Sequence, residues 1–104
     1  MPKLFKYLNR DGSCRYAPGH RWPIPSDGKP GDWMPPVVGP LKRGNAYHAC
    51  LGRDVLLWSG DLFFEVESRG ERVDLPEQVL LREARLVRQL PLSARLLAYM
   101  GRLE

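Results

Sequence analysis

The stretch Asn45-Ala46-Tyr47-His48-Ala49-Cys50 contains small, aromatic and apolar residues, and this composition predicts a short buried strand. The chain then passes through Gly52-Arg53-Asp54, where an aspartate is suited to cap a helix of about two turns over Val55-Leu56-Leu57-Trp58. Ser59-Gly60-Asp61 ends that helix, and Leu62 to Glu67 follows as a second strand. Strand, short helix and strand form the central unit around which the rest of the chain is arranged.

The second strand of this unit has one face in the core. Apolar and charged residues alternate along it, as in a half-buried strand. Ser68 to Glu71 has the composition of a tight turn, which would lead into Arg72 to Leu75 before Pro76 ends that piece. The alternation assigns Phe64 and Val66 to one face, and Phe63, Glu65 and Glu67 to the other.

The C-terminal third contains one ambiguous segment and one clear segment. Val79 to Leu90 fits both a helical spacing of apolar residues and a strand with partly polar faces. We favour the strand, because Pro91 bounds the segment and a continuing sheet is the simpler topology. Ala94 to Gly101 is predicted to form a terminal amphipathic helix. Its apolar face is expected to carry Leu96, Leu97 and Met100.

The N-terminal part predicts a β ribbon followed by a long loop. Leu4 to Leu8 is rich in β-prone residues, and Asn9 to Gly12 is a turn composition from which Ser13 to Tyr16 returns as a short second strand. Seven of the ten prolines then lie between Pro18 and Pro40. Because proline fixes φ and removes an amide donor, this stretch is expected to be neither regular helix nor central strand.

Together these segments predict an α+β fold. The expected architecture is a small mixed or antiparallel sheet with one short helix after the central strand, a C-terminal helix and a long Pro-rich loop. A chain of 104 residues can form one modest core, so residues 1–104 are expected to be a single domain with residues 18–40 as a loop insertion.

The positive charge is concentrated in the first half of the chain. Residues 1–45 contain eight Lys or Arg against three Asp, whereas residues 46–104 contain eight Arg against nine acidic residues. A basic surface of this kind could meet nucleic acid, an acidic protein or a phosphate-bearing ligand. Charges on solvated loops would give the same balance, so both interpretations stay open.

The sequence predicts a cytoplasmic location, which would be the host cell cytoplasm for a phage-encoded protein. No apolar run approaches the roughly 20 residues of a membrane span, and the first residues lack the apolar centre of a signal peptide. The spacing of Cys14, Cys50, His20 and His48 lacks the close ligand pairs of zinc sites, so we expect free thiols and no metal.

The proline-rich segment supplies the candidate partner-binding residues. Long loops in compact domains are often functional. This one carries basic and aromatic residues, although it has few apolar residues with which to form a core of its own. The alternative is that both tryptophans fold back to cover a face of the sheet, because a large aromatic surface is costly to leave in water. The candidates are His20, Arg21, Trp22, Trp33, Lys42 and Arg43.

The order of motifs resembles a family of small domains of unknown function that occur in phage and prophage proteins. The resemblance extends over about nine-tenths of the chain, with Asn45-Ala46-Tyr47 where Gly-Phe is usual and a longer segment at Pro18 to Pro40. It implies a phage or mobile-element source and no particular activity. The matching segments are Lys3 to Tyr7, Asp11 to Arg15, Tyr47-His48-Ala49-Cys50, Asp54-Val55-Leu56, Phe64-Glu65-Val66-Glu67 and Ala84 to Leu90.

The order of strands and short helix is also similar to that of ADP-ribosyltransferases of the poly(ADP-ribose) polymerase type. That resemblance implies that NAD is bound or used, with three active-site positions falling near Lys6, at His48 and at Glu83. His48 would bind the carboxamide or ribose, and Glu83 would stabilise positive charge on the ribose in the transition state. The first position is a histidine in those enzymes, whereas a lysine stands here.

The sequence favours a non-catalytic binding module over an enzyme. It shows no nucleophile with a paired base, no P-loop, no metal-ligand spacing and no paired carboxylates. We therefore expect a phage-type accessory domain, without cofactor, that binds a host or phage protein through the basic loop. A transferase-like domain that uses NAD is one alternative, and nucleic-acid binding through the basic N-terminal half is a second.

Overall fold

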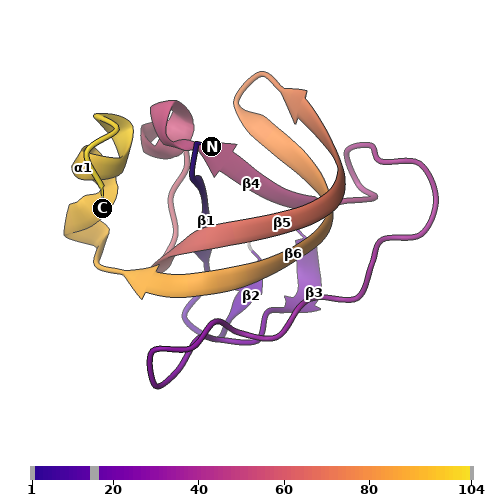
Figure 1. Cartoon of the computed structure of the whole chain (residues 1–104), viewed down its shortest axis with the longest axis horizontal. Helices are drawn as coiled ribbons and strands as arrows, with labels where there is room; N and C mark the ends of the chain where they lie inside the picture. Colours follow the sequence, from indigo (N-terminus) through magenta and orange to yellow (C-terminus); the bar gives the residue numbers. More distant parts are fainter. Residues whose placement is uncertain (1, 15–16, 104) are drawn as a thin grey trace.

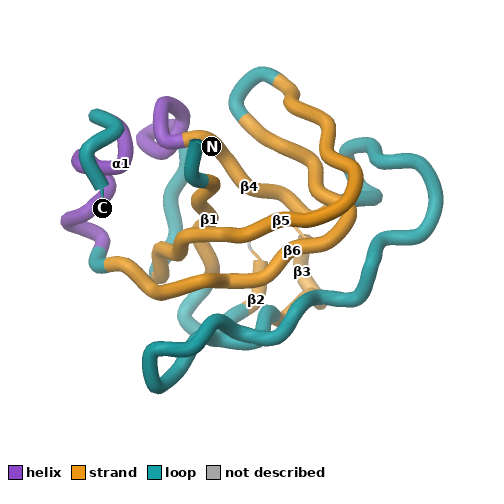
Figure 2. The backbone as a smooth tube through the Cα atoms, viewed as in Figure 1, coloured by secondary structure: helices purple, strands orange, loops and turns teal. Residues whose placement is uncertain are grey.

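The computed structural model describes residues 2–14 and 17–103 of the protein, and for residues 17–20 it describes the backbone alone. Strands dominate, and the short helical elements lie together at one end of the molecule (Figures 1 and 2). The strands are β1 Leu4–Leu8, β2 Ser13–Cys14, β3 Ala17–Arg21, β4 Tyr47–Leu51, β5 Leu62–Leu75 and β6 Gln78–Leu90. The helical elements are the 3-10 helices η1 Gly52–Leu57 and η2 Leu92–Ala94, and the α-helix α1 Arg95–Tyr99.

Four antiparallel strands close into a small barrel in the order β1-β4-β6-β5, while β2 and β3 form a separate two-stranded sheet. The predicted α+β class is confirmed, with an antiparallel sheet, a short helix after β4 and a C-terminal helix. The strand preferred for Val79 to Leu90 is also confirmed, because β6 spans Gln78–Leu90.

β5 and β6 form a long hairpin that provides most of the sheet. The predicted turn at Ser68 to Glu71 is wrong, because β5 runs through it without ending. The register shifts between Arg69 and Arg72, where Gly70 has a φ of +77°, so the glycine serves an irregularity inside the strand. The turn of the hairpin lies at Pro76 and Glu77 instead.

The predicted ribbon between Leu4–Leu8 and Ser13–Tyr16 is also wrong. β2 pairs with β3, which begins at Ala17 and runs into the proline-rich region, and Arg15 and Tyr16 lie outside the described residues. All five residues of β1 are buried, and its two edges are occupied by β5 and β4. A strand buried on both faces needs sheet neighbours on both edges, which leaves no edge for β2.

The alternation along the strands builds two core clusters on opposite faces of the sheet. Phe64 and Val66 belong to the larger cluster, as the alternation in Leu62 to Glu67 predicted, and Phe63 belongs to the smaller one. The larger cluster also includes Leu4, Leu8, Trp22, Met34, Leu81, Ala84 and Leu86. The smaller cluster packs under the helices and includes Phe5, Tyr7, Cys50, Val55, Leu90, Ala94 and Ala98.

The C-terminal helix turns a different face to the core from the one predicted. Leu96 and Met100 are 56% and 49% exposed, and Leu97 is also exposed, whereas Ala98 is buried. The reason is the close approach of α1 to η1: a Cβ at Gly52 would lie 2.4 Å from the carbonyl oxygen of Ala98. Glycine at position 52 therefore allows this approach of the two helices, in which Ala98 is buried and the leucines are exposed.

The segment from residue 31 to residue 37 is fixed along the edge of β6. The amides of Gly31, Met34 and Val37 donate to the carbonyl oxygens of Leu86, Ala84 and Arg82, at 2.9, 2.9 and 3.0 Å. Pro35 and Pro36 lie between two of these donors, at positions whose amides bond no strand, so the prolines remove no hydrogen bond to β6. The expected long loop is therefore irregular in structure but bound to the sheet.

Candidate functional site

The candidate site is a cavity at the seam where β1 and β4 separate. The register of these strands comprises Leu4↔Leu51 and Phe5↔Cys50, and beyond it the strands diverge (Figure 1). The seam opens into a cavity of about 250 Å³. Its lining consists of Phe5, Lys6, Tyr7, Cys14, Arg43, Gly44, His48, Ala49, Cys50, Trp58 and Gln78.

Lys6 is the most unusual residue of this lining, because its ionisable amine is buried. Lys6 is 6% exposed, and no described carboxylate forms an ion pair with it. Nζ donates to the carbonyl oxygen of His48 at 2.7 Å, lies 3.6 Å from Sγ of Cys14 and lies 4.9 Å from the ring centre of Trp22. Burial lowers the pKa of Lys6 below its usual value, and the neighbouring Cys14 and Cys50 oppose that shift.

His48 and Arg43 continue the polar lining of the cavity toward solvent. Burial lowers the pKa of His48, and the nearby charges of Lys6 and Arg43 lower it further. The imidazole is therefore mainly neutral at pH 7. Arg43 is exposed, and no ion pair joins it to an acid among the residues that the structure describes.

The remaining walls are apolar or neutral. The hydroxyl of Tyr7 donates to the carbonyl oxygen of Val55 at 2.8 Å, and the indole nitrogen of Trp58 donates to that of Glu77 at 2.9 Å. Burial, with a smaller effect from the charge of Asp54, raises the pKa of Cys50 to about 12. No aspartate or glutamate lines the cavity, whose lining residues are all described. The site is thus positive or neutral throughout.

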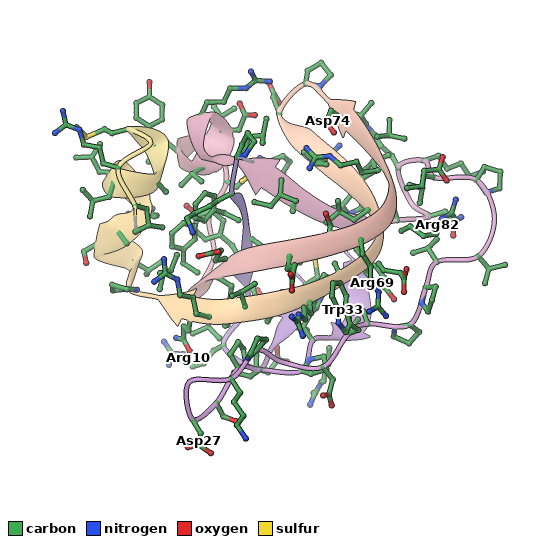
Figure 3. The ribbon with its side chains drawn as sticks, viewed as in Figure 1. Arg10, Asp27, Trp33, Arg69, Asp74 and Arg82 are labelled. Atoms are coloured by element: carbon green, nitrogen blue, oxygen red, sulfur yellow. The ribbon has the colours of Figure 1, made fainter. Side chains whose placement is uncertain are left out.

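The two candidate tryptophans have different surroundings. Trp22 is 4% exposed and packs edge-on against Tyr47, with ring centres 5.3 Å apart, as expected for a tryptophan that covers the sheet. Trp33 is half-buried, with the guanidinium carbons of Arg69 and Arg85 at 4.0 and 4.8 Å from its ring centre (Figure 3). Both rings are thus held by the fold, and neither lines the cavity.

The basic candidates do not form one cluster around the cavity. Arg21 is exposed and approaches Asp11 at 3.8 Å. Lys42 is exposed beside Arg43, and of these three only Arg43 lines the cavity. The backbone of His20 lies in β3, but its side chain is outside the described residues.

The transferase-like positions come together only in part. Lys6 and His48 meet at the cavity, through the hydrogen bond from Nζ to the His48 carbonyl oxygen. Glu83 does not line it, and its carboxylate pairs with Nε of Arg69 at 3.0 Å. Arg69 also contacts the ring of Trp33, and Glu83 therefore lies away from the cavity that Lys6 and His48 line.

Sequence reasoning named Lys6 only through the transferase resemblance and missed its burial, and it missed Tyr7, Cys50 and Trp58 as lining residues. A signal for Lys6 was available, because it stands between Leu4 and Leu8 at the alternate positions of one strand. A lysine at such a position points to the same face as two core leucines. The separation of β1 from β4, which creates the cavity, depends on contacts between distant segments and leaves no local pattern.

Within residues 2–14 and 17–103, no group of three or more His, Cys, Asp or Glu side chains is arranged to hold a metal ion. No helix in the described part of the chain has the length and apolar character needed to cross a membrane. The sequence matches no known protein family and no curated protein, and the fold matches no solved structure. The likeness to phage and prophage domains therefore stays a prediction.

Proposed function

We propose that this domain is a non-catalytic binding module whose seam cavity receives a carboxylate-bearing, apolar chain end of a partner protein. The observation that carries the proposal is the acid-free lining of the cavity, with the buried amine of Lys6 and the exposed guanidinium of Arg43. Burial lowers the pKa of Lys6, and an incoming anion would oppose that shift and stabilise the ammonium form.

The size of the cavity favours the end of a macromolecule over a whole dinucleotide. Pockets that enclose drug-sized ligands generally have volumes of about 300–1,000 Å³. At about 250 Å³, this cavity has room for one large side chain with its carboxylate. NAD would extend well beyond it, so the cavity supports a protein partner more than the NAD alternative. A host or phage protein is the partner class that the sequence led us to expect.

Each part of such a ligand has a matching part of the lining. Arg43 offers a planar guanidinium, which can donate two parallel hydrogen bonds to a carboxylate. Phe5, Tyr7 and Trp58 provide aromatic surface for an apolar side chain. Tyr7 and Trp58 are fixed by hydrogen bonds to backbone carbonyl groups, so little ordering cost is expected on binding.

The test is an NMR titration with two short peptides that end in leucine, one with a free C-terminal carboxylate and one with a C-terminal amide. We expect the acid to shift the amide signals of His48 and Cys50, and the amide peptide to bind at least about tenfold more weakly. Arg43→Gln should reduce the affinity for the acid about five- to tenfold. Arg53→Gln is the matched control, because Arg53 is exposed and lies outside the lining.

Equal binding of the two peptides would contradict the proposal, and so would shifts that avoid the cavity. A short DNA duplex, titrated at two salt concentrations, separates the nucleic-acid alternative. Binding to phosphates would weaken steeply with salt and would depend on Lys42 and Arg43 together. Tight, salt-sensitive binding of the duplex, together with no signal shifts from the peptide acid, would indicate nucleic acid rather than a protein as the partner.

A further inference from the structure

Lys6 and Cys14 form a contact that anion binding does not require. Nζ of Lys6 lies 3.6 Å from Sγ of Cys14, although the two residues belong to different sheets. Both residues are buried, at 6% and 4% exposure, and both line the seam cavity. A nucleophilic nitrogen and an oxidisable sulfur are thus in contact at a place that a small oxidant can reach.

We propose that Cys14 and Lys6 are a peroxide-sensitive modification site, at which oxidation of the sulfur leads to a covalent nitrogen–sulfur bond between the two side chains. Hydrogen peroxide is the oxidant. The bond would link β1 to β2 across the cavity and would be reversible by thiols.

The chemistry balances in two steps. In the first, the sulfur of Cys14 attacks one oxygen of peroxide, the O–O bond breaks, and a sulfenic acid and one water form. In the second, the lone pair of Nζ attacks that sulfur, the S–O bond breaks, and the hydroxyl leaves as water with a proton from Nζ. A sulfenic acid is known to condense with a backbone nitrogen in this way, and the lysine amine supplies the equivalent nitrogen here. The lowered pKa of Lys6 favours the neutral amine that the second step needs.

The chain contains its own control, because Cys50 is the second cysteine and lines the same cavity. Burial and the charge of Asp54 raise the pKa of Cys50 to about 12, which keeps its sulfur as the unreactive thiol. Cys14, in contrast, receives a hydrogen bond from a lysine side chain. Oxidation should therefore select Cys14 over Cys50.

The cross-link would also remove the cation from the cavity, because a nitrogen bonded to sulfur is weakly basic. Binding of the leucine-ended peptide acid should then fall at least about tenfold, and a thiol reductant should restore it. This consequence rests on the proposed function, whereas formation of the bond does not. If the bond forms but the peptide acid binds neither state, the proposed function fails and the modification site stands.

The experiment treats the wild-type protein with a small excess of hydrogen peroxide and compares intact masses and tryptic peptides with and without dithiothreitol. We expect a mass loss of about 2 Da that dithiothreitol reverses. Cleavage after Lys6 should be lost, and the peptide from Leu4 to Arg10 should be joined to the peptide that contains Cys14. Cys50→Ala should form the same product, which excludes a disulfide.

Three results would overturn the proposal: a Cys14–Cys50 disulfide, oxygen retained on Cys14 with Lys6 free, or oxidation of Cys50 before Cys14. Lys6→Arg keeps a cation beside the sulfur but should give a sulfenic acid that dimedone traps, with no cross-link. If that variant does not fold, the wild-type peptide map and Cys50→Ala decide the question by themselves.

Discussion

The β5–β6 ribbon and the β1–β4 seam belong to the same closed sheet, but they are held together in different ways. β5 and β6 pair from Phe63↔Leu90 to Leu75↔Gln78, and ion pairs such as Glu67–Arg85 connect side chains across the ribbon. The register of β1 and β4 is much shorter, and a lysine donates to a β4 carbonyl oxygen where that register ends.

The difference shows how this small domain divides stability from binding. In the ribbon, all five arginines of β5 and β6 pair with an acid, so their charge is already balanced. At the seam, Lys6 and Arg43 have no such partner among the described residues, and a cavity lies between the strands. The ribbon stabilises the barrel, which allows the seam to stay open.

The largest effect is expected from a variant that breaks the ribbon's own core. Phe63 is fully buried, and its ring lies 5.5 Å from that of Phe5 and 4.9 Å from that of Tyr7. Phe63→Ala should lower the free energy of unfolding by about 3–5 kcal/mol, through lost burial and the cavity left behind. Urea denaturation followed by circular dichroism measures this, with exposed Gln89→Ala as the control. A loss below about 1 kcal/mol would contradict the role given to the ribbon.

A smaller loss is expected at the outer edge of the ribbon, where the proline-rich segment is bound. A Cβ at Gly31 would lie 2.2 Å from the carbonyl oxygen of Pro23, so the backbone has to move. Gly31→Ala should destabilise the protein by about 1–3 kcal/mol, as overpacking generally does. It should also speed exchange of the Met34 amide, which hydrogen exchange by NMR detects. Ser26→Ala, an exposed change in the same segment, should leave both unchanged.

At the seam, Lys6→Met should change the stability little, because two effects oppose each other. Removal of the buried charge relieves a desolvation cost, whereas the His48 carbonyl oxygen loses its donor, so the net change at pH 7 should stay within about 1.5 kcal/mol. Peptide-acid binding should nevertheless fall at least about tenfold. Lys3→Met, at a surface ion pair, is the matched control.

The same variant has a characteristic pH dependence. The pKa of Lys6 is lowered in the folded state, so the unfolded chain binds more protons between that folded value and 10.5. Stability of the wild type relative to Lys6→Met should therefore rise with pH in that window. Taking the difference between the two proteins cancels the titration of other groups. A difference that is flat with pH up to 10.5 would show that folding leaves the pKa of Lys6 unchanged, which would contradict the prediction.

His48 should give a seam-specific loss of stability in mild acid. Its pKa is lowered in the folded protein, so the unfolded state takes up the proton first as the pH drops below the ordinary value of 6.5. The free energy of unfolding therefore decreases as the pH is lowered. His48→Gln should make the thermal unfolding temperature depend less on pH between pH 7 and pH 5. His20→Gln is the control for the other histidine. Asp11 and Asp74 also have lowered pKa values, but they act below the ordinary value of 3.8.

The smallest effect is expected for the ion pairs of the ribbon. Glu67 and Arg85 contact at 2.6 Å, with side chains 47% and 29% exposed. A double-mutant cycle with Glu67→Gln and Arg85→Gln should give a coupling of about 0.2–1 kcal/mol, because solvent screens the pair. A much larger coupling would assign the ribbon's stability to charge rather than to its buried phenylalanines.

The alternation from Leu62 to Glu67 predicted one strand correctly, because a half-buried strand repeats its pattern every second residue. The turn placed at Ser68 to Glu71 failed for a local reason. A glycine flanked by polar residues suits an irregular strand as well as a turn, and only pairing with β6 distinguishes them. The predicted core face of α1 was wrong for a tertiary reason, since the position of the helix depends on the close approach of the Ala98 backbone to Gly52.

The candidate site was less predictable than the fold. His48 was identified from sequence, and the structure places it at a cavity with Lys6 and Arg43. Glu83 was grouped with His48 by resemblance alone, and strand pairing places it opposite Arg69 instead. Cavities depend on where neighbouring strands part, and that is decided by the register between distant segments.

The amides of Gly31, Met34 and Val37 are three residues apart, whereas their acceptors Leu86, Ala84 and Arg82 are two residues apart, and this one-to-one match limits changes in the length of the segment. An insertion or deletion between Gly31 and Val37 would leave at least one of these hydrogen bonds unmade. Trp33 would then move relative to the two arginines that hold its ring. Natural or engineered variants of this domain should therefore accept length changes before residue 31 or after residue 37 better than between them.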